Sequence, residues 1–420
     1  MSNRKYFYWV IAVIAFLEMG TYGGAINNIN NLFVIPVSDT LGITRGTYSL
    51  ALSCRSLVAI LSNLVMGVFL RRFGYRNSVT VSLAIAAGGF ALLATSQNVT
   101  MLVLGAVLIG AAEGVCAAGG VARLVGNWFH KHHGLILGVI TAATGLGGSV
   151  LSIALTALMG AYNWRVAFGF SATCILAVGL LIMILVKDRP ESMGLVPYGE
   201  GHDIRHKKRT VDDHWHGYTF AQLKKKPSFY VFLVLTFLSS LCIYSVFSVI
   251  VPHFQDIGMS KETAAQINSV MLIMLSVGKL LFGFCSDKFG TKPVTLVCLA
   301  LMILSMFFLS VVDSALVGYI TVIVYALALP LVGVTLPLLV PSMYGYGSGS
   351  SSVGICLAMV PAANMLGGIL SNTLFDVIGE YRPIFFVNIF AAAVITIGYI
   401  VLFIWTGNDR KKLELLENSN

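Results

Sequence analysis

Charged residues are scarce in this chain of 420 residues. Asp, Glu, Lys and Arg make up 11% of it, against about 25% in soluble domains, while apolar residues make up 57%. This composition excludes an ordinary soluble protein. The seven cysteines all lie inside apolar runs without close pairing, so the sequence indicates neither a disulfide framework nor a zinc site.

Several motifs are also missing. The nucleotide-binding pattern GxxxxGK[ST] does not occur, which argues against a pump driven by ATP. No cleavable signal peptide is evident, because the first apolar run is too long and leads into further apolar runs. Most histidines are loosely spaced in polar turns with no cysteine nearby. We therefore expect that the chain is not an enzyme and that it holds neither a cofactor nor a metal ion.

Apolar runs dominate what is present. Each is long enough to cross a hydrocarbon layer of about 30 Å as a helix. The twelve runs lie near 7–36, 46–70, 77–96, 100–125, 134–159, 165–187, 228–254, 262–285, 292–311, 314–341, 350–376 and 382–406. They predict two six-helix bundles with a linker and a tail, divided as 1–187, 188–227, 228–406 and 407–420.

The two halves repeat one plan. One constant offset in numbering pairs Gly67 to Arg76 (GVFLRRFGYR) with Gly283 to Lys292 (GFCSDKFGTK). The same offset pairs Pro36 with Pro252 and Thr44 with Ser260. A slightly larger offset pairs Leu146-Gly147-Gly148 with Leu366-Gly367-Gly368. We expect Thr44 and Ser260 to cap the helices that follow them. The paired prolines are expected to end the helices that precede them. A repeat that spans half of the chain is typical of a duplicated transporter half.

Lys and Arg are distributed unevenly between the predicted loops. With the N-terminus inside, the inside segments hold 20 of them and the outside segments hold 4. Both termini are therefore expected in the cytoplasm of a multi-pass protein of the cell membrane, plasma or inner. The net charge of +9 is then mainly a topology signal, so we expect a lipid bilayer and no nucleic acid as partner, and a monomer.

The repeated turns resemble a known signature. The signature GxxxDRxGRR joins helices 2 and 3 in the major facilitator superfamily. In the second copy Asp287 matches the acid of this signature, and in the first copy Arg71 stands in its place. Three further stretches are similar to the monocarboxylate transporter and oxalate:formate antiporter branch of that superfamily: Phe33 to Leu50, Trp128 to Gly138 and Asp188 to Gly199. The resemblance covers the whole chain.

The resemblance implies an all-α membrane protein, with twelve transmembrane helices in two pseudo-symmetric six-helix bundles that work by alternating access. Its cytoplasmic turns would form the gate, through Arg72, Arg76, Asp287, Lys288 and Lys292. In this branch the position of Lys279 carries the arginine that binds the substrate carboxylate. Lys279 would therefore bind an anion, although a structural contact is the alternative, and a single central cation favours a monoanion.

Charged side chains inside the apolar runs need an explanation, because a charge at mid-bilayer costs about 3 kcal/mol. Arg123 lies near a predicted helix end and can extend to the headgroups. Glu18 and Glu113 lie deeper, where desolvation disfavours the charged form, so either could carry a proton. Arg55 can neutralise only one of them well. We expect Glu113 to pair with it and Glu18 to carry the proton.

Amide side chains are also frequent in the apolar runs. Asn27, Asn28, Asn30 and Asn31 fall within five positions, and unpaired amides facing lipid would be costly, so at least two should face a cavity. The candidate substrate-binding residues share a polar side chain at membrane depth: Lys279, Asn27, Asn28, Asn31, Tyr22, Asn63, Asn268, Asn364 and Arg55.

Together these features predict a secondary active transporter for a small organic monocarboxylate, coupled to protons by symport. Organic anion exchange, as in oxalate/formate antiport, is the nearest alternative. An exporter of drugs or organic cations is a further alternative, because a cavity with acids and amides also accepts cations. A transporter-like sensor is the last alternative.

Overall fold

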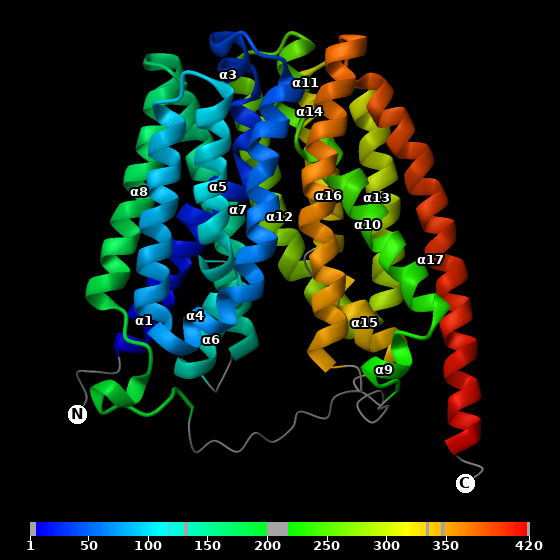
Figure 1. Cartoon of the computed structure of the whole chain (residues 1–420). Coiled ribbons are helices and arrows are strands. Elements are labelled where there is room, and N and C mark those ends of the chain that lie inside the picture. Colours follow the sequence, from blue (N-terminus) through cyan, green and yellow to red (C-terminus); the bar gives the residue numbers. More distant parts are fainter. Residues whose placement is uncertain are drawn as a thin grey trace. The chain divides into compact units, whose positions relative to one another are not determined.

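The computed structural model describes residues 6–116, 118–129, 133–199, 217–332, 336–345 and 349–417. Across these ranges the chain is helical and contains no β-strand, apart from one isolated bridge between Phe129 and Tyr198 (Figure 1). Helices satisfy every backbone donor and acceptor within one segment, which an apolar run inside a bilayer requires. The predicted all-α fold is confirmed.

The described residues of the first half form eight α-helices and three short helical turns of other types. Their bounds are α1 Tyr6–Glu18, η2 Met19–Gly23, α2 Gly24–Asn28, η3 Asn30–Leu32, α3 Val34–Leu41, α4 Arg45–Ala94, α5 Val99–Cys116, α6 Ala118–Trp128, α7 His133–Ala161, α8 Trp164–Leu185 and η4 Pro190–Met193. Here η2 is a π-helical turn, and η3 and η4 are 3₁₀ turns.

In the part of the second half that the structure describes, the chain forms nine α-helices. Their bounds are α9 Phe220–Leu223, α10 Pro227–Phe247, α11 Ile250–Asp256, α12 Lys261–Phe289, α13 Thr291–Val311, α14 Ala315–Ala328, α15 Leu336–Tyr344, α16 Gly349–Ile378 and α17 Arg382–Glu417.

The chain divides into two compact units. The first comprises residues 1–203, 247–276 and 368–380, and the second comprises 204–246, 277–367 and 381–420. The first unit thus takes in α11, most of α12 and the end of α16 in addition to α1–α8. In the second unit, α13 packs against α14 and α17.

Nine helices in the described ranges are long and apolar enough to cross a membrane. Of the twelve predicted runs, those without such a helix are 46–70, 314–341 and 350–376. Each of these three runs includes residues that the structure leaves undescribed, in whole or in their side chains.

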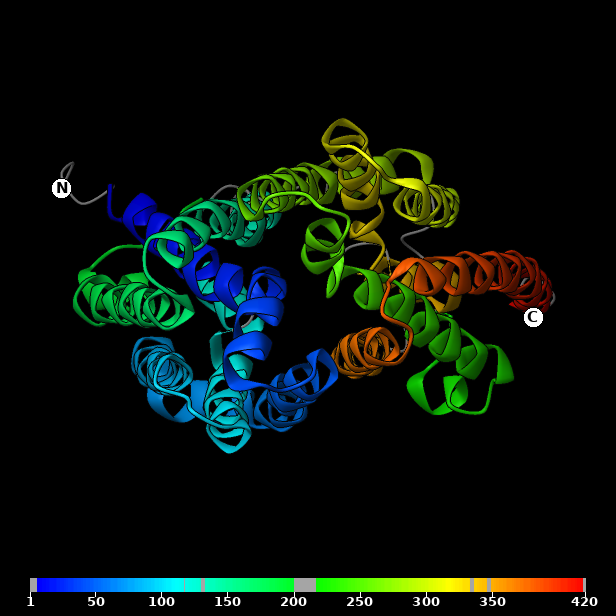
Figure 2. The same ribbon diagram turned by 90° about the horizontal axis from the view of Figure 1, so that it is seen from above.

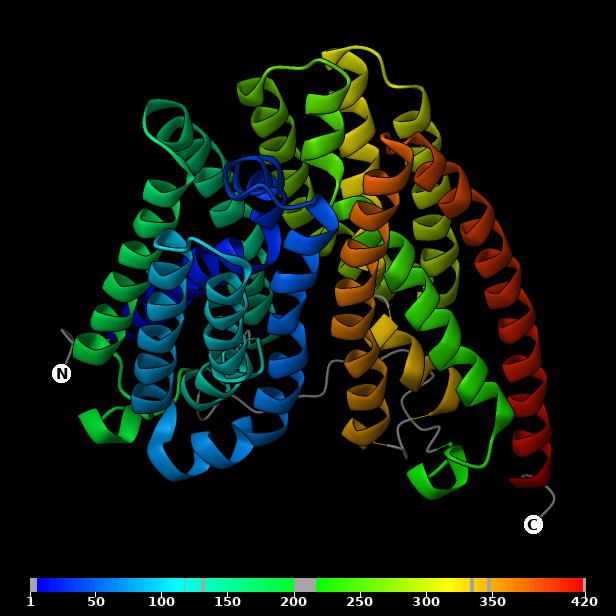
Figure 3. The same ribbon diagram turned by 45° about the horizontal axis from the view of Figure 1, so that its top comes forward.

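Helix α4 is two helical arms joined at Gly74. This glycine has φ 76° and ψ 170°, a conformation that side chains other than hydrogen rarely allow. The arms lie on either side of α5, which contacts α4 more than any other element does (Figures 1 and 3). The break therefore lies in the turn of the predicted signature and reverses the chain there.

The first apolar run is less regular than the sequence predicts. It breaks into α1, the π-helical turn η2, α2, the 3₁₀ turn η3 and α3. The segment packs along α7, as the view from above shows (Figure 2). At Gly24 an added Cβ would lie 2.7 Å from the Gly148 nitrogen, so glycines on both helices allow the backbones to approach closely.

Helix ends test two predictions about the repeat. The Thr44 and Ser260 side chains each accept a hydrogen bond of 3.1 Å from the N–H group three residues later, so both predicted caps are confirmed. The prediction for Pro36 and Pro252 is wrong. Each lies in the first turn of a short helix, α3 or α11, where its missing N–H group costs no intrahelical bond.

Both ends of the polar stretch between the halves dock onto helix ends. The Tyr198 N–H group donates to the Trp128 carbonyl at 2.8 Å, and the Tyr218 N–H group donates to the Tyr344 carbonyl at 3.0 Å. The numbering offset that relates Gly67 to Gly283 also relates Trp128 to Tyr344, so the two attachment points correspond in the repeat. We call these two contacts the linker staples.

Candidate functional site

Glu18 is fully buried at the point where α1 passes into the π-helical turn η2. Its Oε2 atom accepts a hydrogen bond from the Tyr75 hydroxyl, and its Oε1 atom has no hydrogen-bond partner among the described residues. No cation of the described part of the chain forms an ion pair with it. A buried charge without a counter-ion is costly, so this environment favours a carboxyl group that holds its proton.

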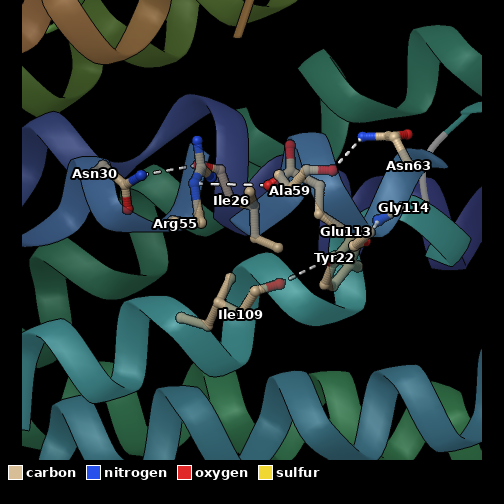
Figure 4. A network of polar contacts seen from close by, with 10 residues as sticks. Tyr22, Ile26, Asn30, Arg55, Ala59, Asn63, Ile109, Glu113 and Gly114 are labelled. Atoms are coloured by element: carbon tan, nitrogen blue, oxygen red, sulfur yellow. Dashed lines mark hydrogen bonds and ion pairs between the residues drawn. The ribbon is translucent and has the colours of Figure 1, made fainter. Parts of the chain in front are cut away.

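Arg55 and Glu113, in the same unit as Glu18, form an ion pair. The Arg55 Nε atom is 3.7 Å from Glu113 Oε2, and its Nη1 atom donates to the Ile26 carbonyl at 2.7 Å. The exposed fraction is 10% for the Arg55 side chain and 21% for that of Glu113. Figure 4 shows this pair together with Tyr22, whose hydroxyl donates to the Ile109 carbonyl at 3.4 Å. The two acids therefore have different partners, and the predicted pair of Glu113 and Arg55 is present.

Two of the predicted amides meet. The Asn31 Nδ2 atom donates to Asn268 Oδ1 at 3.1 Å, and the Asn268 amide donates to the Ser152 hydroxyl at 3.2 Å. Both asparagines are buried, and the chain of bonds joins η3, α12 and α7 inside the first unit. Their donors are used within the protein in this arrangement.

The other amides are placed differently. Asn63 is exposed on α4, and its side chain donates to the Ala59 carbonyl of its own helix at 2.8 Å (Figure 4). Asn364 is half-buried on α16 in the second unit. The side chains of Asn27 and Asn28 lie outside the described residues.

Lys279 is half-buried on α12, four residues before Gly283. It belongs to the second unit, whereas Glu18, Arg55 and Glu113 belong to the first. One helical turn earlier, the Ser276 hydroxyl donates to the Ala142 carbonyl at 2.8 Å and joins α12 to α7. Along the chain, Lys279 therefore lies just after the part of α12 that belongs to the first unit.

The first signature turn is stabilised by an acid from outside it. Asp188, which follows α8, accepts a hydrogen bond from the Arg76 N–H group at 2.7 Å. Its carboxylate occupies the space that a Cβ atom of residue 74 would need. An acid at the first N–H groups of a helix also interacts favourably with the helix dipole. Arg72 lies 5.5 Å from the centre of the Phe73 ring.

Among the described residues, no acid takes this place at the second signature turn. Gly290 corresponds to Gly74 and has a similar φ of 86°, but an added Cβ there would meet nothing within 4 Å. The ammonium groups of Lys288 and Lys292 lie 5.3 and 5.9 Å from the ring centres of Phe289 and Phe403. The Asp287 side chain lies outside the described residues.

The opposite end of the first α4 arm carries a second set of charges. Arg45 forms a two-pronged ion pair with Asp256, with distances of 2.6 and 2.9 Å. Asp376, near the end of α16, accepts from the Arg45 and Gly46 N–H groups at 3.2 and 2.8 Å. These bonds hold the start of α4 to the ends of α11 and α16 within the first unit.

Tyr75, Asp188 and Asp376 were not predicted from the sequence as partners. Tyr75 is a single tyrosine beside a glycine, and nothing local marks it as a partner of Glu18. Asp188 directly follows the run 165–187 and Asp376 is the last residue of the run 350–376, and an acid at such a place could have been tested against the N-terminus of another helix.

The model of the Major Facilitator Superfamily matches residues 8–353 and 254–418. Among the relatives, monocarboxylate transporter 12 of Xenopus laevis is 25% identical over 350 residues, which is 76% of this chain and 72% of that protein. The uncharacterised transporter YhjX of Escherichia coli (strain K12) is 28% identical over 263 residues, which is 60% of this chain and 58% of that protein.

Solved structures show the same fold. A bacterial homologue of the human lysosomal transporter Spinster, in an inward-facing and unoccupied conformation, aligns with a TM-score of 0.75 at 13% identity and covers 97% of this chain and 98% of its own. The nucleoside transporter NupG aligns with a TM-score of 0.73 at 13% identity, covering 94% of this chain and 99% of its own. At these identities the likeness concerns the fold alone.

Proposed function

The chain belongs to the Major Facilitator Superfamily and is a multi-pass membrane transporter, and we propose that it carries a small organic monocarboxylate by alternating access, together with a proton. The proposed moving halves are residues 1–187 and 228–406, joined by the linker 188–227 and followed by the tail 407–420. The proposed orientation has both termini in the cytoplasm, in accordance with the excess of Lys and Arg on that side.

The proposed substrate class is supported by Lys279 and by relatives that are named monocarboxylate transporters. A half-buried ammonium group on a membrane helix is costly to keep, and an anion offsets that cost. We propose that Lys279 holds the substrate carboxylate. The Arg55 guanidinium pairs with Glu113 and donates to the Ile26 carbonyl.

The buried state of Glu18 is the observation that supports proton coupling most directly. An anion that is concentrated against a negative-inside potential needs a compensating positive charge, because moving one charge costs about 2.3 kcal/mol per 100 mV. Glu18 is completely buried with one hydroxyl partner, whereas Glu113 has an ion pair. We propose that Glu18 binds the proton that accompanies the substrate.

The substrate class can be tested by uptake of labelled monocarboxylates into proteoliposomes. We expect Lys279→Gln to abolish binding and uptake while the protein remains extractable and folded, and Lys279→Arg to retain part of the activity. Lys225→Gln, at an exposed position, is the matched control. Wild-type affinity in Lys279→Gln would remove the proposed anchor.

Coupling requires a separate experiment with an imposed pH gradient. We expect Glu18→Gln to exchange labelled for unlabelled substrate but no longer to accumulate it in response to the gradient. Glu380→Gln, which alters an exposed acid just beyond the end of α16, should behave as wild type does. If Glu18→Gln still accumulates substrate, Glu113 or obligate anion exchange becomes the better account.

A further inference from the structure

The Tyr75 side chain connects two parts of the first unit that lie far apart in the sequence. Its backbone directly follows Gly74, where α4 breaks in the first signature turn. Its hydroxyl donates to the Glu18 carboxyl group, where α1 passes into the π-helical turn η2. The side chain is 3% exposed, and an added Cβ at Gly120 of α6 would lie 3.8 Å from its ring. One packed side chain therefore joins the proposed proton site to the proposed gate.

The two neighbours of Tyr75 determine the geometry of the turn. Gly74 has a φ of 76°, and the Arg76 N–H group donates to Asp188 at 2.7 Å. Because each residue has only two soft backbone dihedrals, Tyr75 cannot move without changing the backbone at Gly74 or the bond from Arg76. A change in how firmly the Tyr75 hydroxyl is held is thus transmitted to the turn.

The charge of Glu18 determines how firmly this hydroxyl is held. A hydrogen bond to a carboxylate is roughly twice as strong as one to a neutral group. Glu18 Oε1 has no hydrogen-bond partner among the described residues, so the charged form depends on the Tyr75 hydroxyl that binds Oε2. Loss of the proton therefore strengthens the bond, and binding of a proton weakens it.

Other titratable side chains act on Glu18 or belong to the elements around it. Helix α7, which packs along η2, has none after its first residue. The remaining groups are Tyr22 of η2, Glu113 and Cys116 of α5, and Arg165 and Cys174 of α8. Tyr22 and Cys116 are buried and interact electrostatically with Glu18, but within the described residues neither donates a hydrogen bond to it. Tyr75 is thus the side chain that connects the charge of Glu18 to the turn.

The turn itself does not require this pair. The numbering offset of the two signature turns pairs Glu18 with Val234 and Tyr75 with Thr291. The second half forms a similar turn, with Gly290 at a φ of 86°, although it has neither the acid nor the tyrosine at these positions. The pair is therefore an addition to the shared plan, and burying an acid for it is costly, which favours a role in transport.

We propose that Tyr75 is a positioning residue that transmits the loss of a proton from Glu18 to the first signature turn. The charged Glu18 holds Tyr75 firmly and thereby holds the bond between Arg76 and Asp188, so the turn opens less often. Binding of a proton weakens this hold, and the turn opens more readily. The link to transport rests on the proposed function, in which Glu18 carries the proton.

Hydrogen–deuterium exchange of the purified full-length protein, followed by mass spectrometry over the pH range in which it stays folded, tests the proposal. The Arg76 amide reports on the turn because it is bound to Asp188. After correction for the intrinsic exchange rate, protection in wild type should rise about fivefold with pH, the factor that separates a charge-assisted from a neutral hydrogen bond. Glu18→Gln and Tyr75→Phe should each lose this rise. Tyr48→Phe alters a buried tyrosine of α4 whose hydroxyl has no partner among the described residues, and this matched control should behave as wild type does.

A purely structural role of Tyr75 gives a different result, because Tyr75→Phe would then lower protection equally at every pH and keep the rise. That result, or protection in wild type that does not rise with pH, overturns the proposal. Asp188 is unchanged in every variant, so its own titration cancels in the comparison. If Tyr75→Phe does not fold, Glu18→Gln decides, because a rise that persists in this variant overturns the proposal.

The same variant separates this proposal from the proposed function. If Glu18→Gln loses the rise in protection but still accumulates substrate in response to a pH gradient, the role of Tyr75 is supported and Glu18 is removed as the transport proton site. If Glu18→Gln loses accumulation but keeps the rise, the proposed function is supported and the role of Tyr75 is overturned.

Discussion

Replacing Gly74 by alanine tests the acid that stabilises the first signature turn. Gly74 has φ 76° and ψ 170°, a region that costs a residue with a Cβ on the order of 1–3 kcal/mol. The new Cβ would also displace the Asp188 carboxylate, which accepts the Arg76 N–H group at 2.7 Å. Loss of a hydrogen bond to a charged group costs about 1.5–3 kcal/mol. Gly74→Ala should therefore lower the free energy of unfolding by about 2.5–6 kcal/mol.

Gly290→Ala is the matched control. This glycine holds the corresponding place in the second turn, with φ 86° and nothing within 4 Å of an added Cβ. It should cost only the backbone strain. The difference between the two variants, about 1.5–3 kcal/mol, then measures the contribution of Asp188.

Unfolding in mixed micelles titrated with SDS can measure these free energies, provided that it is reversible. A double-mutant cycle with Asp188→Ala gives the coupling directly, because in that background Gly74→Ala should cost no more than Gly290→Ala does. If Gly74→Ala and Gly290→Ala agree to within about 0.5 kcal/mol in the wild-type background, the argument for Asp188 is refuted.

Two further predictions concern packing in the first unit. Arg45→Ala should lower the free energy of unfolding by about 1 kcal/mol, because the partly exposed ion pair with Asp256 is two-pronged. The exchanged pair, Arg45→Asp with Asp256→Arg, should recover part of this loss. Gly24→Leu should reduce the yield of folded protein sharply, since a Cβ there lies 2.7 Å from the Gly148 nitrogen, whereas Gly88→Leu, with nothing within 4 Å, should not. Size-exclusion chromatography of the solubilised variants measures that yield.

The sequence predicts the helical architecture well because hydrophobic length and the repeat are local or periodic signals. Thr44 and Ser260 were recognisable as caps because the residue type and its place before an apolar run are enough to identify one. The π-helical turn after Glu18 has no such signal. Glycines at 20, 23 and 24 mark a close helix contact, but they do not say that the helical ladder changes there.

The site was predictable only as a set of candidates. The cost of burying charge identified Glu18, Arg55 and Glu113 without their geometry. Tyr75 is 57 positions from Glu18, and Asp188 is 112 positions from Arg76, so these partners depend on how helices pack. The same limit applies to Asn31 and Asn268, whose contact joins the two sequence halves.

The linker staples bear on how the two halves are connected. Tyr198 is bound to Trp128 in the first half, and Tyr218 is bound to Tyr344 in the second, so each half holds its own end of the connection. A gene split between codons 199 and 217 would give two polypeptides that each retain one complete staple. The peptide bonds between the staples are thus not needed for either end to dock, which suits a fold that arose when two copies of one half were fused.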